Sequence, residues 1–117
     1  MGLIQACNVG DLERIGNHAG SNTDSVGTQR DAFTDLLGIT VDPTSVVLAV
    51  ERPDGTRLAY GWPSPGADGL LTKESVGRFY IDLIITQSGK WWWSLTGAGT
   101  VVATTGDSEF WARATRL

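Results

Sequence analysis

Hydrophobic and polar residues alternate along much of this chain, a pattern that predicts β-strands. The clearest case is the run of three tryptophans and the residues that follow it. Because successive side chains of a strand point to opposite faces of a sheet, Trp91, Trp93 and Leu95 share one face, and Trp92 and Ser94 share the other. We expect the first face to lie on the hydrophobic core.

A β-hairpin is the next prediction. Residues 45–51 and 56–62 have the composition of two strands, and residues 53–55 between them form a turn signal, since proline presets φ and glycine accepts a positive φ. Both faces of the first strand are apolar, with Val46, Leu48 and Val50 on one face and Val47 and Ala49 on the other. We therefore expect the first of these strands to be central and covered on both faces.

Further strands are predicted on both sides of this hairpin. Residues 78–86 and 108–115 alternate clearly, the second with Phe110 and Ala112 on its inner face. Shorter candidates occupy residues 12–15, 28–35, 70–73 and 100–105. Seven or eight short strands, separated by turn residues and without helical periodicity, predict an all-β sandwich of antiparallel strands. Its core is predicted to include Trp91, Trp93, Phe79, Ile81, Leu48 and Val50.

The N-terminal quarter of the chain differs in composition. Residues 16–27 are small and polar and have no periodicity, which is typical of a mobile loop or arm. We therefore divide the chain into residues 1–27, an N-terminal strand with a flexible arm or long loop, and residues 28–117, the sandwich. His18 and Asn22 lie in the arm, where we expect them to be solvated and able to contact a neighbouring subunit.

Composition and charge exclude several classes of protein. The chain has 117 residues, a formal net charge of -4 and a single cysteine, so one domain without an internal disulfide is expected. An acidic chain without a run of Lys or Arg is not typical of proteins that bind nucleic acid or an anionic membrane. No apolar stretch approaches the ~20 residues of a membrane-spanning helix, and the N-terminal residues lack the pattern of a secretory signal.

Candidate catalytic groups are few. His18 is the only histidine, and a general base needs an orienting partner and a nucleophile nearby. Cys7 lacks cationic neighbours in the sequence that would lower its pKa, so we expect a small, partly buried apolar residue. Four aspartates match no calcium-loop spacing and have turn-forming or capping roles instead: Asp31, Asp35, Asp42 and Asp54. We predict no catalytic, cofactor or metal site, and a protein that is not an enzyme.

Five tryptophans are many for a chain of this length. Trp91 is expected in the core, whereas Trp62, Trp92 and Trp111 are less constrained and are our aromatic candidates for an interface. An exposed aromatic side chain suits a protein interface or stacking on a sugar ring. A carbohydrate-binding sandwich therefore stays an alternative, and it would need two or three coplanar exposed rings beside amide or carboxylate side chains.

An ordered set of short motifs runs through the second half of the chain. It consists of residues 42–46 (DPTSV), 53–56 (PDGT), 77–83 (GRFYIDL), 89–93 (GKWWW) and 96–97 (TG). This set resembles small immunoglobulin-like proteins encoded in the structural gene blocks of tailed bacteriophages, those of actinobacterial hosts most closely.

The resemblance implies an immunoglobulin-like β-sandwich that is a component of the virion and is assembled in the host cytoplasm. Its expected partners are other virion proteins: connector, tail or major capsid protein. We expect docking at the head–tail connector (neck) or the adjacent tail, in a homo-oligomeric ring or array. Decoration of the capsid surface is the alternative position, and neither nucleic acid nor membrane is an expected partner.

Overall fold

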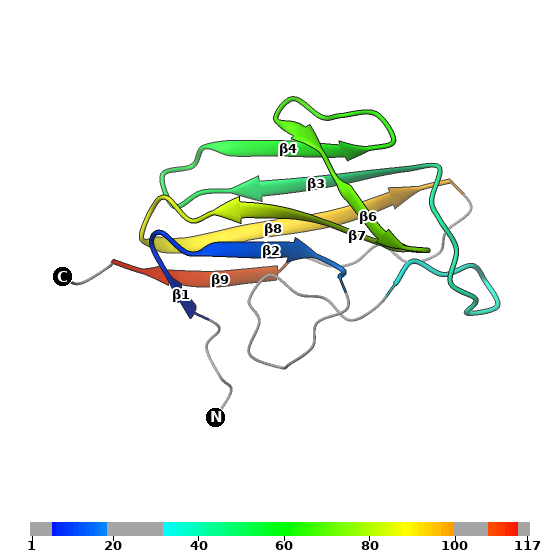
Figure 1. The fold of residues 1–117 in the computed structure, drawn as a ribbon, viewed down its shortest axis with the longest axis horizontal. Helices are drawn as coiled ribbons and strands as arrows, with labels where there is room; N and C mark the ends of the chain where they lie inside the picture. The colour runs from blue at the N-terminus through cyan, green and yellow to red at the C-terminus, as the bar shows by residue number, and fades with distance from the viewer. Residues whose placement is uncertain (1–5, 19–31, 100–107, 115–117) are drawn as a thin grey trace.

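The computed structural model describes residues 6–18, 32–99 and 108–114, which form nine β-strands (Figure 1). None of these residues belongs to a helix long and apolar enough to cross a membrane. The strands are β1 (Ala6–Asn8), β2 (Leu12–Gly16), β3 (Ser45–Glu51), β4 (Arg57–Trp62), β5 (Gly69–Leu70), β6 (Thr72–Ser75), β7 (Arg78–Ile84), β8 (Gly89–Ala98) and β9 (Ser108–Arg113).

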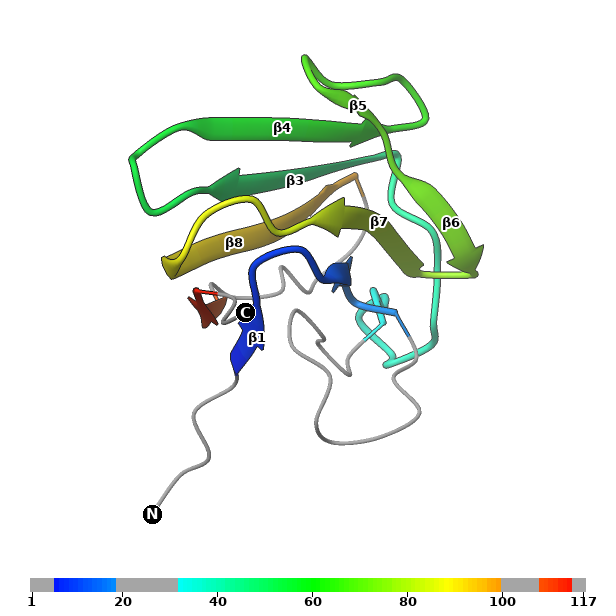
Figure 2. The ribbon, with the colours of Figure 1, turned by 60° about the vertical axis from the view of Figure 1, so that its left-hand side comes forward.

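Two sheets pack face to face in a sandwich-like arrangement. The larger sheet has the strand order β1-β9-β8-β3-β4-β5, and the smaller sheet has the order β2-β7-β6. Figures 1 and 2 show the smaller sheet lying across one face of the larger one. These two sheets confirm the prediction of an all-β, sandwich-like fold, which rests on period-two alternation.

Two strand pairs are parallel, so the expectation of antiparallel strands throughout is wrong. β1 runs parallel to β9, and β5 runs parallel to β4. Neither pair is joined by a tight hairpin, which can only connect antiparallel strands. β1 continues into β2 of the smaller sheet, and residues 63–68 carry the chain back along the edge of the larger sheet before β5 begins.

The predicted register of the tryptophan strand is confirmed. Trp91, Trp93 and Leu95 of β8 are fully buried, whereas Trp92 is only half-buried on the opposite side of the strand. Trp93 pairs with Val50 of β3, which is buried as well. A slip of one residue would have exchanged the two faces of β8, so the alternation of side chains is the reason that this register forms.

β3 is a central strand, as predicted, because β8 and β4 pair with it on either side. Its pairing with β4 also confirms the predicted hairpin around residues 53–55. Only one face of β3 is covered, however, because Val47 points away from the smaller sheet and is 50% exposed. The expectation of cover on both faces is therefore wrong: in the described part of the chain, the smaller sheet covers only the inner face.

The core lies between the two sheets. Five of the six residues predicted for it are fully buried: Trp91, Trp93, Phe79, Leu48 and Val50. The sixth, Ile81, is partly buried and packs against the core cluster. Phe110 and Ala112 of β9 also face inward, as their alternation predicts.

The predicted strand at residues 70–73 is divided between the two sheets. β5 ends at Leu70 in the larger sheet, and β6 begins at Thr72 in the smaller sheet. Leu71 between them is buried. The chain therefore passes from the larger sheet to the smaller sheet at this residue.

Other predicted segments fall partly or wholly outside the described residues. Of the candidate strand at 28–35, the described part forms an isolated bridge between Thr34 and Thr40. The candidate strand at 100–105 and Asn22 lie outside the described residues. β1 and β2, by contrast, are hydrogen-bonded into the larger and the smaller sheet, respectively.

Candidate docking site

Asn17, which follows β2, is fully buried and ties this strand to the turn between β6 and β7. Its Nδ2 donates to the Gly77 carbonyl oxygen at 2.8 Å, and its Oδ1 accepts from the Phe79 amide at 2.7 Å. The guanidinium of Arg78 donates to the Asn17 carbonyl oxygen at 3.0 Å. A buried amide side chain with paired donors and acceptors holds a backbone turn in place.

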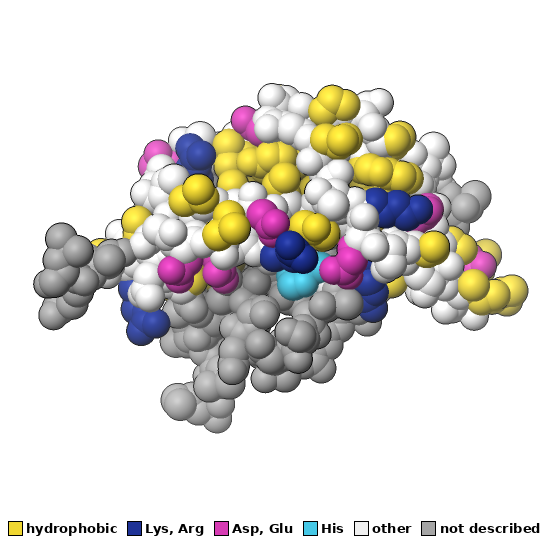
Figure 3. Space-filling view, in the orientation of Figure 1, with side chains coloured by type: hydrophobic (Ala, Val, Ile, Leu, Met, Phe, Trp, Pro, Cys, Tyr) yellow, Lys and Arg dark blue, Asp and Glu magenta, His cyan; other side chains and the backbone are white. Residues whose placement is uncertain are grey.

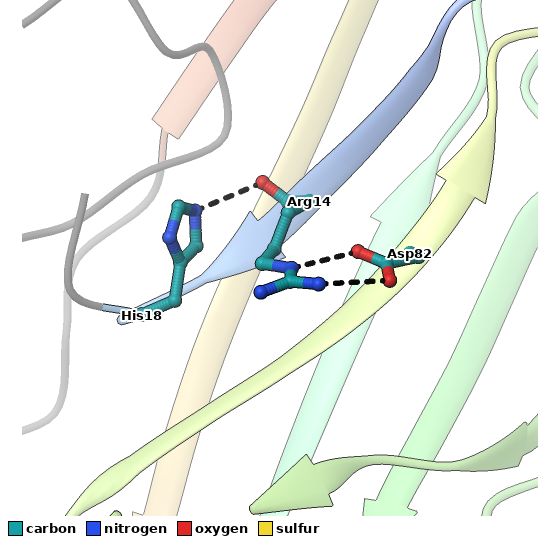
Figure 4. Close-up of polar contacts among 3 residues, drawn as sticks. All are labelled: Arg14, His18 and Asp82. Carbon is teal, nitrogen blue, oxygen red and sulfur yellow. Dashed lines mark hydrogen bonds and ion pairs between the residues drawn. The ribbon is translucent and has the colours of Figure 1, made fainter. Parts of the chain in front are cut away.

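His18 is buried too, so the expectation that it is a solvated interface residue is wrong. Its Nε2 lies 3.1 Å from the Arg14 carbonyl oxygen (Figure 4). Its ring also meets the Tyr80 ring edge-on. Because a carbonyl oxygen can only accept, Nε2 carries the hydrogen. Burial lowers the pKa of His18, which keeps the ring neutral near neutral pH. The hydrogen bonds of the neighbouring Asn17 hold this end of β2 against β7, and His18 is therefore buried as well.

Arg14 and Asp82 form a bidentate ion pair across β2 and β7. Arg14 Nε lies 2.9 Å from Asp82 Oδ1, and Arg14 Nη2 lies 3.2 Å from Asp82 Oδ2 (Figure 4). The guanidinium carbon also lies 3.9 Å from the centre of the Tyr80 ring. The fork-shaped pair and the stacked ring fix the orientation of Arg14, so this cluster holds the two strands in register.

Cys7, on β1, is a buried apolar residue, as the sequence predicts. Burial, followed by the negative charges of Glu13 and Asp11, raises the pKa of its thiol to about 11. The thiolate is the nucleophilic form of cysteine. At neutral pH this thiol is therefore protonated and poorly nucleophilic.

Asp35 and Asp54 have the turn-forming roles that their positions predict. For Asp42 this expectation is wrong, because its partners lie more than 30 residues further along the chain, at Lys73 and Gly77. Asp54 Oδ1 accepts from the Thr56 amide at 2.9 Å, and Asp42 Oδ1 accepts from the Gly77 amide at 2.8 Å. Asp35 accepts from two amides of its own loop. Among the described residues, no group of three or more His, Cys, Asp or Glu side chains could hold a metal ion.

The three tryptophan candidates are not brought together on one surface. Trp62 points inward, with its ring centre 4.8 Å from that of Phe79, and Lys73 Nζ lies 5.7 Å from its ring. Trp92 and Trp111 point outward from the larger sheet, where Trp92 pairs with Glu109 and Trp111 pairs with Lys90. Residues in such positions are diagonal neighbours on one face. An aromatic surface is therefore formed by two tryptophans only, of which Trp111 is 48% exposed.

The 33–41 loop, between β2 and β3, is a short hairpin whose residues are not among the predicted site residues. The Asp35 amide donates to the Ile39 carbonyl oxygen at 2.9 Å, and the Gly38 amide donates to the Asp35 carbonyl oxygen at 3.0 Å. Asp35 Oδ1 accepts from the amides of Leu37 at 2.9 Å and of Ile39 at 3.0 Å. Gly38 has a φ of 80°, which a glycine adopts without strain. The backbone of the turn is thus held by its own hydrogen bonds.

The side chains at the tip of this loop are aliphatic and exposed. Leu36 is 89% exposed, Leu37 is 83% exposed and Ile39 is 58% exposed. The loop projects from one end of the sandwich (cyan, at the right in Figure 1), and hydrophobic side chains gather on this projection in Figure 3. Turns favour Gly, Pro, Asn, Asp and Ser. Three aliphatic residues among the four residues 36–39 are unusual for a turn, and they are the signal that could have identified the loop.

Phe33 fixes the base of the 33–41 loop to the core. Its side chain is fully buried, with its ring centre 6.2 Å from that of Phe79. The Phe33 amide donates to the Gly77 carbonyl oxygen at 3.0 Å, and the Val41 amide donates to the Phe33 carbonyl oxygen at 2.9 Å. Gly77 has a φ of 75°, and a Cβ atom there would lie 2.9 Å from the Phe33 carbonyl oxygen. Only glycine allows the loop to approach the β6–β7 turn so closely.

Comparison with known proteins adds no relative: no family model, curated protein or solved structure matches this chain.

Proposed function

We propose that this chain is an immunoglobulin-like module that docks to other proteins as a non-enzymatic structural component of a tailed-bacteriophage particle. Its position is the head–tail connector (neck) or the adjacent tail, in a homo-oligomeric ring or array. Decoration of the capsid surface, in contact with the major capsid protein, is the second position.

The order of the strands supports the immunoglobulin-like assignment. A variable-type immunoglobulin domain has one sheet built on strands G, F and C, extended by C′ and C″, and a second sheet with strands B, E and D. If β2 to β9 are named B, C, C′, C″, D, E, F and G, the larger sheet has the order β1-G-F-C-C′-C″, and the smaller sheet has the order B-E-D. The single cysteine excludes the disulfide that joins strands B and F in antibody domains, and the core of this chain contains the fully buried Trp91 and Trp93 instead.

The exposed aliphatic tip of the 33–41 loop is the observation that carries the docking function. Contiguous apolar patches on a monomer are frequently interaction sites, and this one lies on a hairpin with an internally bonded backbone. The chemical states of Cys7, the candidate nucleophile, and His18, the candidate base, support a function without catalysis. Cys7 is protonated at neutral pH, and the Nε2 of His18 is bonded to a main-chain carbonyl.

The ordered motif set at residues 42–46, 53–56, 77–83, 89–93 and 96–97 supports the assignment to a virion. A net charge of -4 disfavours contact with the packaged genome, which requires basic surface. Protein contacts with neighbouring virion components are therefore the interaction that we propose.

Quantitative mass spectrometry and immunogold labelling of purified particles test this function. The particles come from the phage that carries the gene. We expect a fixed number of copies per particle and gold label at the junction of head and tail. Label confined to the capsid shell would move the protein to the second position. A protein absent from purified particles would overturn the proposal.

Carbohydrate binding is a second candidate, favoured by Trp92 and Trp111 on the outer face of the larger sheet. Lys90 and Glu109 lie beside them, 3.2 Å apart as an ion pair. Titration with soluble glycans would quench tryptophan fluorescence in the wild type and not in a Trp92→Ala, Trp111→Ala variant. An unchanged emission spectrum at millimolar glycan would exclude this candidate.

A further inference from the structure

We infer that the 33–41 loop is the element that makes the docking contact. Leu36, Leu37 and Ile39 insert into an apolar pocket on a protein other than this chain, and Lys or Arg side chains line the rim of that pocket. This inference rests on the proposed function as a docking module, and it specifies the surface and the chemistry of the partner.

The loop is preorganised for insertion. The amides of Leu37, Gly38 and Ile39 all donate to Asp35, to its side chain or to its carbonyl oxygen. Phe33 holds the base of the hairpin in the core. A loop already fixed in its bound conformation loses little conformational entropy on binding. Most of the free energy gained by burying its aliphatic side chains is therefore available for binding.

The same hydrogen bonds define the mode of contact. Because the amides of Leu37, Gly38 and Ile39 are occupied inside the loop, the tip does not offer them to a partner strand for addition to a sheet. What it offers is aliphatic side chains. The complementary surface is therefore a concave apolar pocket, as in other interfaces where a few buried side chains dominate the affinity.

Charge distinguishes a protein pocket from a membrane surface. The 33–41 loop contains no Lys or Arg, and Asp35 is its one charged residue, whereas Asp42, which follows the loop, is paired with Lys73. Segments that insert into a membrane interface use Lys or Arg beside the apolar residues to attract anionic lipids. A tip with Asp35 at its base instead complements an apolar pocket with a basic rim.

The size of the tip argues against a tip-to-tip contact with a second copy of this chain. A stable interface buries about 800 Å² on each partner, from about 20–30 residues. A tip-to-tip contact between two copies involves three exposed side chains on each, which is too few for a stable pair. Insertion into a pocket surrounds the same three side chains with partner atoms on all sides.

Photo-crosslinking tests the identity of the occupant. The complete chain is produced in infected cells with p-benzoylphenylalanine at position 37, or at position 47 as the control for an exposed apolar residue on β3. We expect a product from position 37 with one other protein, mapped to an apolar site flanked by Lys or Arg, and no such product from position 47. A product with a second copy, a product with lipid, or no product from position 37 would overturn the inference.

A double variant tests the contribution of the side chains. Leu36→Ser, Leu37→Ser should lower the yield of the protein in purified particles by at least about 100-fold, as expected when two interface side chains that dominate binding are truncated. Val47→Ser is the matched control and should be incorporated like the wild type. Both variants should have the same melting temperature as the wild type, measured by circular dichroism, because the three substituted residues are exposed.

The two experiments separate the two proposals. Undiminished incorporation of the double variant overturns the role of the tip and leaves the virion function standing. If the wild-type protein is absent from particles and position 37 still crosslinks to a basic-rimmed pocket, the virion function fails and the role of the tip stands. If the double variant does not fold, the crosslink from position 37 in the otherwise wild-type chain decides.

Discussion

Trp91 and Trp93 provide a matched test of how hydrogen bonding contributes to this core. Both side chains are fully buried on the same face of β8. Trp91 Nε1 donates to the Gln87 carbonyl oxygen at 2.9 Å, and its ring stacks on Phe110 at a centroid distance of 6.0 Å. Trp93 Nε1 has no hydrogen-bond partner within the described part of the chain. The perturbation is the same substitution, Trp to Phe, at each position.

The expected magnitudes follow from three contributions. Replacing a buried Trp by Phe removes apolar area and leaves a small cavity, which costs about 1–2 kcal/mol at either position. At Trp91 the lost hydrogen bond adds about 1 kcal/mol. At Trp93 the substitution removes an unsatisfied buried N–H, which returns about 1–3 kcal/mol. We therefore expect Trp91→Phe to lower the free energy of unfolding by about 2–3 kcal/mol, and Trp93→Phe to leave it nearly unchanged.

Urea denaturation followed by far-ultraviolet circular dichroism measures both changes, because tryptophan fluorescence itself differs between the variants. The dependence of the free energy on urea should stay the same in all three proteins, so that midpoints compare directly. Equal losses at the two positions, or a larger loss at Trp93, would refute the argument from the indole N–H.

Three further predictions concern buried polar groups. Asn17→Ala leaves the buried Phe79 amide without its acceptor and should lower the free energy of unfolding by about 2–3 kcal/mol in urea titrations; the exposed control Asn8→Ala should change it little, and equal effects would contradict this role. Burial lowers the pKa of His18 in the folded chain, so the unfolded chain binds a proton at higher pH. Stability should therefore fall as the pH drops below about 6.5, down to the folded pKa. His18→Gln should weaken the dependence of the urea midpoint on pH between pH 7 and pH 5. The same pH dependence in the variant and the wild type would contradict the lowered pKa. The Cys7 thiol, with its pKa raised to about 11, should resist Ellman's reagent at pH 8 in the native protein and react fully in urea; equally fast reaction in both states would show that the thiol is accessible.

Strand faces could be predicted from the sequence because alternation is a local property. The inward positions of β8 and β9 follow directly from the order of apolar and polar residues in each strand. The hairpin turn at residues 53–55 follows from the conformational preferences of Pro and Gly. Each of these features depends on neighbours within a few positions of the chain.

The burial of Asn17 and His18 could not be predicted in this way. Both occur in a polar segment, and their partners come from elsewhere in the fold. The acceptor and donor for the Asn17 side chain lie 60 and 62 residues further along the chain, at Gly77 and Phe79. A polar residue is buried where the fold supplies hydrogen-bond partners, and composition carries no information about such distant partners.

Periodicity and turn chemistry along the chain are sufficient for an all-β fold, for the register of the tryptophan strand and for most of the core, because each side chain's direction in a strand depends only on its position in that strand. Which strands become neighbours, where the chain crosses between sheets at Leu71, and which apolar residues stay uncovered depend on contacts between distant segments. The aliphatic tip at Leu36 and Leu37 shows the difference most clearly. A Leu side chain is buried wherever another element lies over it, and only the packing of the whole sandwich leaves these two residues projecting into solvent.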